Sequence, residues 1–159
     1  MNVPDNKEIE VVDVEKGTIL AKWPVTTSKN NFPMSLDEAH HRLFVGAWTP
    51  PRLLVFDTES GKQIAALPLS EQGVADPSIV GATDDLFYDA ARSRIYVLNA
   101  RGAIDVFQQK DPDHYAMLAS VPTPLKSQTG LFVTEWGKLF VGVIQQGSKN
   151  AEVQIYQAN

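Results

Sequence analysis

The strongest constraint on how this chain folds is a set of short phrases that recur in a constant order. One phrase, a basic residue followed by apolar or aromatic residues, occurs at 42–45 (RLFV), 94–97 (RIYV) and 138–141 (KLFV), with starts 52 and 44 residues apart. A second phrase follows each copy, at 53–56, 104–107 and 153–156, and a further copy stands alone at 9–12. Recurrence at periods of about 20–50 residues indicates a solenoid or a β-propeller.

Two further segments complete each repeat. A phrase that ends in proline follows the second phrase, at 21–24 (AKWP), 65–68 (AALP) and 119–122 (ASVP). Proline cannot donate a hydrogen bond within a sheet, so this phrase is expected to close an outermost strand. A fourth segment precedes each first phrase, at 33–36, 85–88 and 130–133. Four short β-prone segments per repeat predict the four-stranded blade of a β-propeller.

The predicted fold is therefore all-β, a partial β-propeller of about three four-stranded antiparallel blades plus a remnant. We expect one domain with a remnant at 7–25, blades at 32–69 and 83–123, and an incomplete blade at 129–157. This arrangement has about 13 strands and no helix longer than one or two turns. The chain opens on a third strand and closes after one, so its end faces are expected to be open. It is then either the C-terminal half of a longer propeller or, if complete, a candidate homodimer.

Composition excludes several functional classes. The 159 residues are 43% hydrophobic and 21% charged, which is typical of a globular domain, and no apolar run reaches the length of a membrane span. A formal net charge of −5 makes nucleic acid an unfavourable partner. The absence of cysteine excludes disulfides, thiolate nucleophiles and Cys-ligated zinc. The polar, acidic N-terminus does not read as a signal peptide, so the compartment is left open.

The phrases resemble the repeats of the YncE-like, YVTN-repeat β-propellers of bacteria. The segment 96–99 (YVLN) is the nearest copy of the Tyr-Val-Thr-Asn phrase, and 43–46 and 139–142 (both LFVG) are degenerate copies. The runs 55–61 (VFDTESG) and 11–17 (VVDVEKG) match the turn that ends that family's third strand. The resemblance implies a non-catalytic binding or scaffolding propeller, periplasmic or secreted, usually of about seven blades.

Few residues suggest a chemical site. Asp84 and Asp85 form the only acidic pair at the start of an expected innermost strand. Asn31 stands at the start of another innermost strand. Because side chains alternate along a strand, the two carboxylates are expected to point to opposite faces. Asp84, Asp85 and Asn31 are candidate ligand-binding residues. The two aspartates could also bind a hard cation, although a hydrogen bond to a neighbouring blade is the commoner role. Arg52 and Arg101, in loops between second and third strands, are candidates for a basic rim. We expect neither a resident metal nor a cofactor.

Catalysis has little support in the sequence. There is no nucleophile elbow, P-loop or dinucleotide-binding phrase, and His40, His41 and His114 all lie near turns, where exposed structural roles are commoner. Two function classes stay open. One is a non-catalytic propeller that binds an unknown protein or small molecule. The alternative is a lactonase-like hydrolase that uses Asp84 and Asp85 to hold a divalent metal.

Overall fold

A computed structural model describes residues 1–71 and 83–159 and shows an all-β chain. The strands form four antiparallel sheets, each a simple meander. The first sheet contains β1 (Asn2–Val3), β2 (Glu8–Asp13) and β3 (Thr18–Pro24). The second contains β4 (Lys29–Asp37), β5 (Arg42–Thr49), β6 (Pro51–Asp57) and β7 (Gln63–Pro68).

The third sheet contains β8 (Leu86–Asp89), β9 (Arg94–Asn99), β10 (Ala103–Asp111) and β11 (His114–Pro122). The fourth contains β12 (Thr129–Val133), β13 (Lys138–Val143) and β14 (Glu152–Gln157). The described helices are two single 3-10 turns, η1 (Pro4–Asn6) and η2 (Thr134–Trp136), as expected. In the described part of the chain, no helix has the length and apolar character needed to cross a bilayer.

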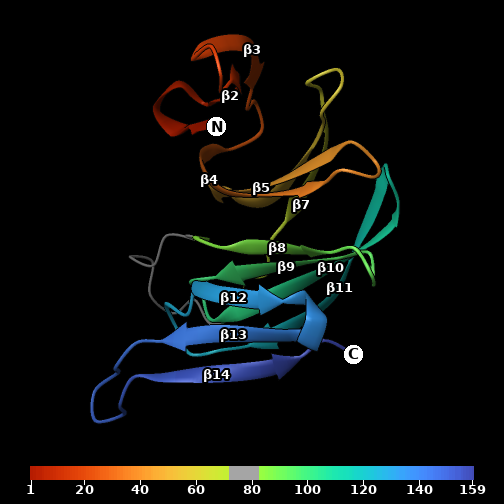
Figure 1. The fold of residues 1–159 in the computed structure, drawn as a ribbon. Helices are drawn as coiled ribbons and strands as arrows, with labels where there is room; N and C mark the ends of the chain where they lie inside the picture. The colour runs from red at the N-terminus through yellow and green to blue at the C-terminus, as the bar shows by residue number, and fades with distance from the viewer. Residues whose placement is uncertain (72–82) are drawn as a thin grey trace.

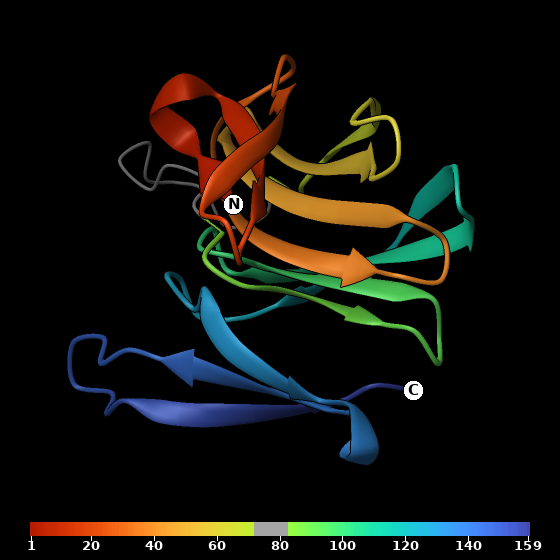
Figure 2. The same ribbon diagram turned by 45° about the horizontal axis from the view of Figure 1, so that its top comes forward.

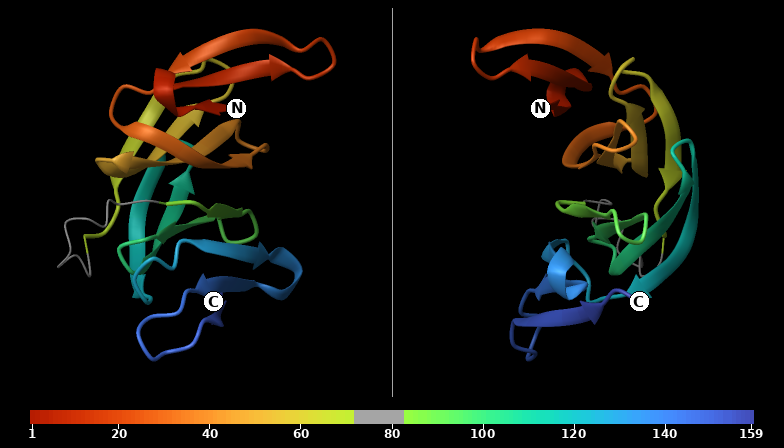
Figure 3. Two further views of the ribbon diagram at one scale, coloured as in Figure 1. Left: turned by 90° about the vertical axis from the view of Figure 1, so that its left-hand side faces the viewer. Right: turned by 45° about the vertical axis from the view of Figure 1, so that its right-hand side comes forward.

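The four sheets stack one after another along an open arc, which is a partial β-propeller (Figure 1). Figure 3 shows β4, β8 and β12 toward the inside of the arc and β7 and β11 along its convex side. The sheet of β2 and β3 lies at one end of the arc and the sheet of β12–β14 at the other (Figure 2). Each of the two middle sheets therefore has one face toward the preceding sheet and one toward the following sheet.

Three apolar cores lie between successive sheets, because alternate residues of each strand point to opposite faces. In the middle core, Phe44 and Val55 of the second sheet belong to one buried cluster with Ile95, Val97 and Phe107 of the third sheet. The first core joins Ile9 and neighbours to Val45 and Phe56, and the last joins Tyr96 to Leu139. Blade stacking therefore supplies the burial that stabilises each sheet.

The first sheet holds one strand more than the sequence indicated. Its β2 and β3 match β6 and β7, because both pairs have a register shift at the same point, after Val11 and after Val55. They are therefore third and fourth strands, as expected. The added β1 pairs Asn2 with Ile9 and takes part of a second strand's place. The described strands number 14 rather than 13, because two residues are too few to show a strand pattern.

The turn from first to second strand explains the adjacent histidines. His41 has a φ of 56°, and the same position holds Ser93 at 50° in the third sheet and Gly137 at 56° in the fourth. All three residues stand directly before the second strand. His41 therefore fills the left-handed position that this turn requires, where glycine has the lowest steric cost.

Candidate functional site

The candidate ligand residues of the inner strands lie at junctions between sheets. The Asn31 side-chain amide, fully buried, donates to Asn2 Oδ1 at 2.7 Å and to the Glu8 carbonyl at 3.3 Å. Asp84 Oδ2 accepts from Gln128 Nε2 at 2.6 Å. Asp85 Oδ2 accepts from the Gly130 backbone N–H at 2.9 Å. Asn31 therefore joins the second sheet to the first, and Asp84 and Asp85 join the third sheet to the fourth.

The expectation that Asp84 and Asp85 point to opposite faces is wrong. Strand β8 begins only at Leu86, so the alternation of a strand does not apply to either aspartate. Both carboxylates instead reach the same segment of the following sheet, Gln128 to Gly130. Within residues 1–71 and 83–159, no three acidic or histidine side chains gather as a metal site would require.

The two candidate rim arginines lie in different sheets. Arg52 lies within β6, not in the loop before it as expected, and donates from Nη1 to the Ala66 carbonyl at 3.3 Å. Arg101 follows β9, and its backbone N–H donates to Asn99 Oδ1 at 3.1 Å. The contacts described for each arginine stay within its own sheet. Their role as a basic rim stays a prediction.

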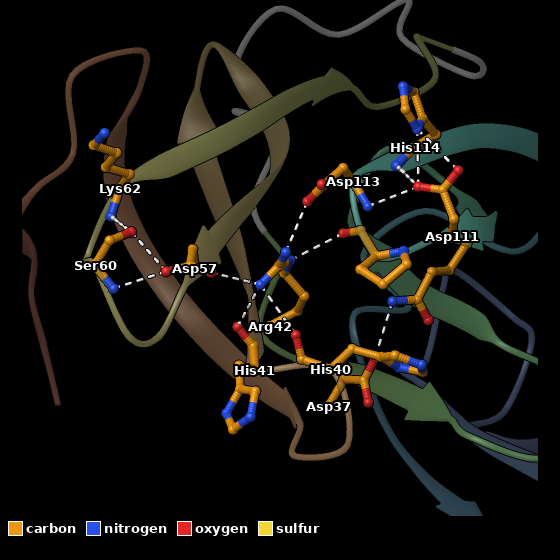
Figure 4. Close-up of polar contacts among 12 residues, drawn as sticks. Asp37, His40, His41, Arg42, Asp57, Ser60, Lys62, Asp111, Asp113 and His114 are labelled. Atoms are coloured by element: carbon orange, nitrogen blue, oxygen red, sulfur yellow. Dashed lines mark hydrogen bonds and ion pairs between the residues drawn. The ribbon is translucent and has the colours of Figure 1, made fainter.

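A polar cluster that the sequence did not single out joins the second and third sheets at the ends of their strands (Figure 4). Asp37 ends β4 and is buried, and its Oδ2 accepts from Gln109 Nε2 at 2.9 Å and interacts with His40 Nδ1 at 2.8 Å. Tyr88 donates its hydroxyl to Gln109 Oε1 at 2.6 Å. Burial would raise the pKa of Asp37, but the hydrogen bonds from Gln109 and His40 outweigh it and hold that pKa below its usual value.

Arg42 is the central cation of this cluster (Figure 4). Its Nη1 lies 2.6 Å from Asp57 Oδ2 in its own sheet, and its Nη2 lies 2.7 Å from Asp113 Oδ1 in the next. Nε also donates to the Pro112 carbonyl at 3.0 Å. The planar guanidinium can serve all these acceptors at once because its donors form a rigid fork. In this blade, the basic residue of the first phrase therefore links two sheets. We call this set of Arg42 contacts the inter-sheet clamp.

The three histidines fill structural places rather than a shared site. His40 contacts Asp37 within the cluster, and His114 Nδ1 lies 2.8 Å from Asp111 Oδ1 in an exposed hairpin. His41 occupies the turn position described above, and its carbonyl accepts a hydrogen bond from Arg42 Nη1 at 3.0 Å.

The outer face of the last sheet is apolar and open. We call it the C-terminal face, and it consists of Leu131, Phe140, Val153 and Ile155. Phe140 pairs across the strands with both Leu131 and Ile155, so the three side chains stand side by side. Leu131 is 59% exposed, Val153 64% and Ile155 59%. The ring of Trp136 packs against Phe140, with centroids 6.1 Å apart.

The same repeat positions are buried in the preceding sheets. Phe140 occupies the place of Phe44 and Tyr96, because each follows its sheet's first-phrase basic residue by two positions. Ile155 occupies the place of Val55 and Val106, which pair with those aromatic residues. Each of these four equivalents is buried by the following sheet. The C-terminal face is thus a blade-stacking surface with nothing stacked on it among the described residues.

The opposite end of the arc is built differently. Glu10 in the first sheet is equivalent to Leu54 in the second. Glu10 pairs with Lys22 of β3, and Leu54 pairs with Ala66 at the same register position of β7. Lys22 Nζ lies 2.8 Å from Glu10 Oε1 and 2.7 Å from Glu8 Oε1. These ion pairs place charged side chains on the outer side of the first sheet, and Ile19 and Leu20 of β3 are exposed as well.

Comparisons with known proteins agree with this architecture. No protein-family model matches the chain, and the search among curated proteins found no match. Among solved structures, the chain is similar to a propeller-like chain in the crystal structure of a mitotic checkpoint complex, with a TM-score of 0.72. The match covers 97% of this chain and 43% of that chain at 8% identity. At this identity the likeness shows the fold alone, and the chain spans less than half of its neighbour's length.

Removing divalent metals is expected to leave stability unchanged. A metal that binds only the folded state would stabilise it by mass action, so a chelator would lower the melting temperature. Asp84 and Asp85 each accept a hydrogen bond from the next sheet, so we expect the fold to need no cation there. Thermal unfolding with and without EDTA measures this. A clear drop in melting temperature on chelation would contradict this expectation and favour the lactonase-like hydrolase with a divalent metal.

Two aspartates are expected to affect stability in opposite directions near pH 7. The folded state lowers the pKa of Asp37, so its stabilisation is present above the ordinary pKa and is lost as pH falls through the lowered one. Burial chiefly, with the charge of Asp85, raises the pKa of Asp84 despite the hydrogen bond from Gln128. The Asp84 carboxylate therefore destabilises the fold once pH rises through that raised pKa.

The matched variants test this sign difference. Asp37→Asn should destabilise the protein at pH 7 by about 1 kcal/mol, because it weakens charge-assisted hydrogen bonds. Asp84→Asn should be neutral or stabilising at pH 7, because the amide oxygen can still accept from Gln128. Both differences should shrink at acid pH, measured by urea unfolding between about pH 3 and 8. Two variants with the same sign at pH 7 would contradict this account.

Proposed function

We propose that this chain is a non-catalytic β-propeller module that binds another polypeptide through its C-terminal face. The observation that carries the proposal is the exposure of Val153 and Ile155, whose equivalents in the second and third sheets are buried. Contiguous exposed apolar surface on a folded domain commonly marks a protein-interaction site. At the other end of the arc, Lys22 forms ion pairs with Glu8 and Glu10 instead.

Two further points support a binding role. The propeller-like neighbour comes from a protein complex, which is consistent with a scaffold. The YVTN-like phrases favour membership of the YncE-like propellers, and we propose that family for the chain. The lactonase-like alternative depends on Asp84 and Asp85, whose carboxylates already accept hydrogen bonds from the next sheet.

Site-specific cross-linking tests the binding role. A benzophenone amino acid at Leu131 should form one discrete protein adduct in an extract of the source cells. Excess unlabelled chain should suppress this adduct, and excess Phe140→Glu/Ile155→Glu chain should not. The same probe at Val14, which is 91% exposed in the β2–β3 turn, is the control and should form no such adduct. Equal labelling at both positions, or no suppressible adduct at Leu131, would overturn the proposal.

A further inference from the structure

The last strand, β14, has an open edge. In the other three sheets the third strand pairs on both sides, and its outer partner is β3, β7 or β11. Strand β14 pairs with β13, and no other strand of the described residues lies beside it. An unpaired edge presents a row of backbone donors and acceptors that can pair with another strand. The edge of β14 and the C-terminal face belong to the same sheet.

The three filled fourth-strand places use one register and one residue pattern. In each sheet, an alanine of the fourth strand faces a valine of the third strand. An apolar residue, two positions after the alanine, faces an aliphatic residue two positions before that valine. A proline comes next on the fourth strand and faces the residue that precedes the aliphatic one. The alanine pairs are Ala21 with Val11, Ala65 with Val55 and Ala119 with Val106. The apolar pairs are Trp23 with Ile9, Leu67 with Leu53 and Val121 with Ile104. The prolines are Pro24, Pro68 and Pro122.

The residue between the alanine and the apolar residue follows the chemistry of its partner. Lys22 faces Glu10 and forms an ion pair with it at 2.8 Å. Ser120 faces Asp105 and donates its hydroxyl to Oδ1 at 2.8 Å. At the same place Ala66 faces Leu54, so an apolar partner is matched by an apolar residue. This position therefore adapts to the third strand while the others stay constant.

Strand β14 presents the matching third-strand residues. Ile155 stands where the alanine would face, Val153 where the apolar residue would face, and Gln154 lies between them. Since Gln154 is polar, the residue opposite it is expected to be polar. The open edge thus specifies an incoming strand of the form Ala-polar-apolar-Pro, antiparallel to β14.

Backbone geometry agrees with this register. The residue directly after the proline donates its N–H to the start of the third strand in each sheet, as when Leu69 donates to the Pro51 carbonyl at 3.2 Å and Thr123 to the Gly102 carbonyl at 2.9 Å. Backbone groups of a strand point alternately to its two neighbours, so the N–H groups of Ala119 and Val121 also face β10. Proline then falls at a position whose N–H would point away from the third strand. By the same alternation, Val153 and Ile155 direct their backbone groups to the open edge.

We propose that β14 binds an extended Ala-polar-apolar-Pro segment of another polypeptide by strand addition. A second copy of this chain is the less suitable donor, because its β3, β7 and β11 are already paired within their own sheets. Strand addition gains affinity from main-chain hydrogen bonds and specificity from alternate side chains. The proposal rests on the proposed function and specifies how the partner is bound.

A peptide of residues 114–123 (HYAMLASVPT), which is β11 plus one residue, is the probe, with binding measured by fluorescence anisotropy. Methylating the peptide nitrogen of Val121 should weaken binding by about tenfold or more, because it removes a ladder donor. Methylating the nitrogen of Ser120 is the matched control and should change binding by less than about twofold, because that nitrogen points away. Val153→Pro in the protein should cause the same loss as methylated Val121, with an unchanged melting temperature.

Each other outcome overturns the proposal in a distinct way. If no peptide binds at millimolar concentration but the Leu131 adduct forms, the binding module stands and strand addition is wrong. If neither peptide binding nor the adduct is seen, both proposals fail. Equal effects of the two methylated peptides, or binding that Val153→Pro leaves intact, place the peptide elsewhere. A dimer in sedimentation that Val153→Pro dissociates would assign the edge to a second copy instead.

Discussion

Phe44→Ala should destabilise the protein by about 3–5 kcal/mol, the usual cost of removing a fully buried aromatic ring from a core. The Phe44 ring is fully buried between the second and third sheets, with its centroid 5.1 Å from that of Tyr88 and 5.8 Å from that of Tyr115. The third sheet cannot fill the space without shifting, because stacked sheets are closely packed. Chemical denaturation monitored by tryptophan fluorescence measures the loss.

Phe140→Ala is the matched control, since Phe140 holds the same repeat position on the C-terminal face. With no following sheet described over it, its removal should cost about 1 kcal/mol or less. The difference between the two variants reports directly on whether a face is covered. Equal losses would show that the C-terminal face is buried in solution, which would contradict the open surface on which the proposed function depends.

Arg42→Ala should cost about 2–3 kcal/mol, because it leaves Asp57 and the Pro112 carbonyl, which are both partly buried, without their charged donor. Arg42 is largely buried and serves Asp57, Asp113 and the Pro112 carbonyl. Lysine should not restore the full stability, because one ammonium group cannot reach the acceptors on both sides. Urea unfolding of the alanine and lysine variants measures both effects.

Arg94→Ala is the control at the equivalent position of the third sheet. Arg94 donates from Nε to Gln108 Oε1 at 3.4 Å and from Nη1 to the backbone oxygen of Asn159, the last residue of the sequence. Among its described contacts no Asp or Glu side chain corresponds to Asp57, so its loss should cost less than about 1 kcal/mol. If Arg94→Ala matched Arg42→Ala, the inter-sheet clamp would not be specific to the second blade.

These two comparisons bear on function as well as stability. The Phe44 and Arg42 junction shows what a complete blade contact contains: an apolar core and a polar clamp at the strand ends. The C-terminal face has the apolar half of such a contact in Phe140 and Ile155. A partner that covers it would therefore gain most from apolar burial, with main-chain pairing at β14 setting the register.

The order of the strands could be predicted from the sequence because it is a local property. Each strand is a short β-prone run, and the recurrence of four runs in one order specified a meander in every repeat. The same local signals identified 9–12 as a third strand and the proline-ended phrases as fourth strands, which the pairings of β2 and β3 confirm. A two-residue strand such as β1 carries too little pattern to be seen.

Only the tertiary structure decided which side chains meet and which stay open. Gln109 reaches Asp37 across 72 residues of sequence and Arg42 reaches Asp113 across 71, and no local pattern encodes such contacts. Phe44 and Phe140 hold the same position in two copies of the first phrase, yet Phe44 is fully buried and Phe140 lies on the open C-terminal face. The physical reason is that a strand's sequence determines which side chains share a face, whereas burial of that face depends on whether another sheet stacks against it.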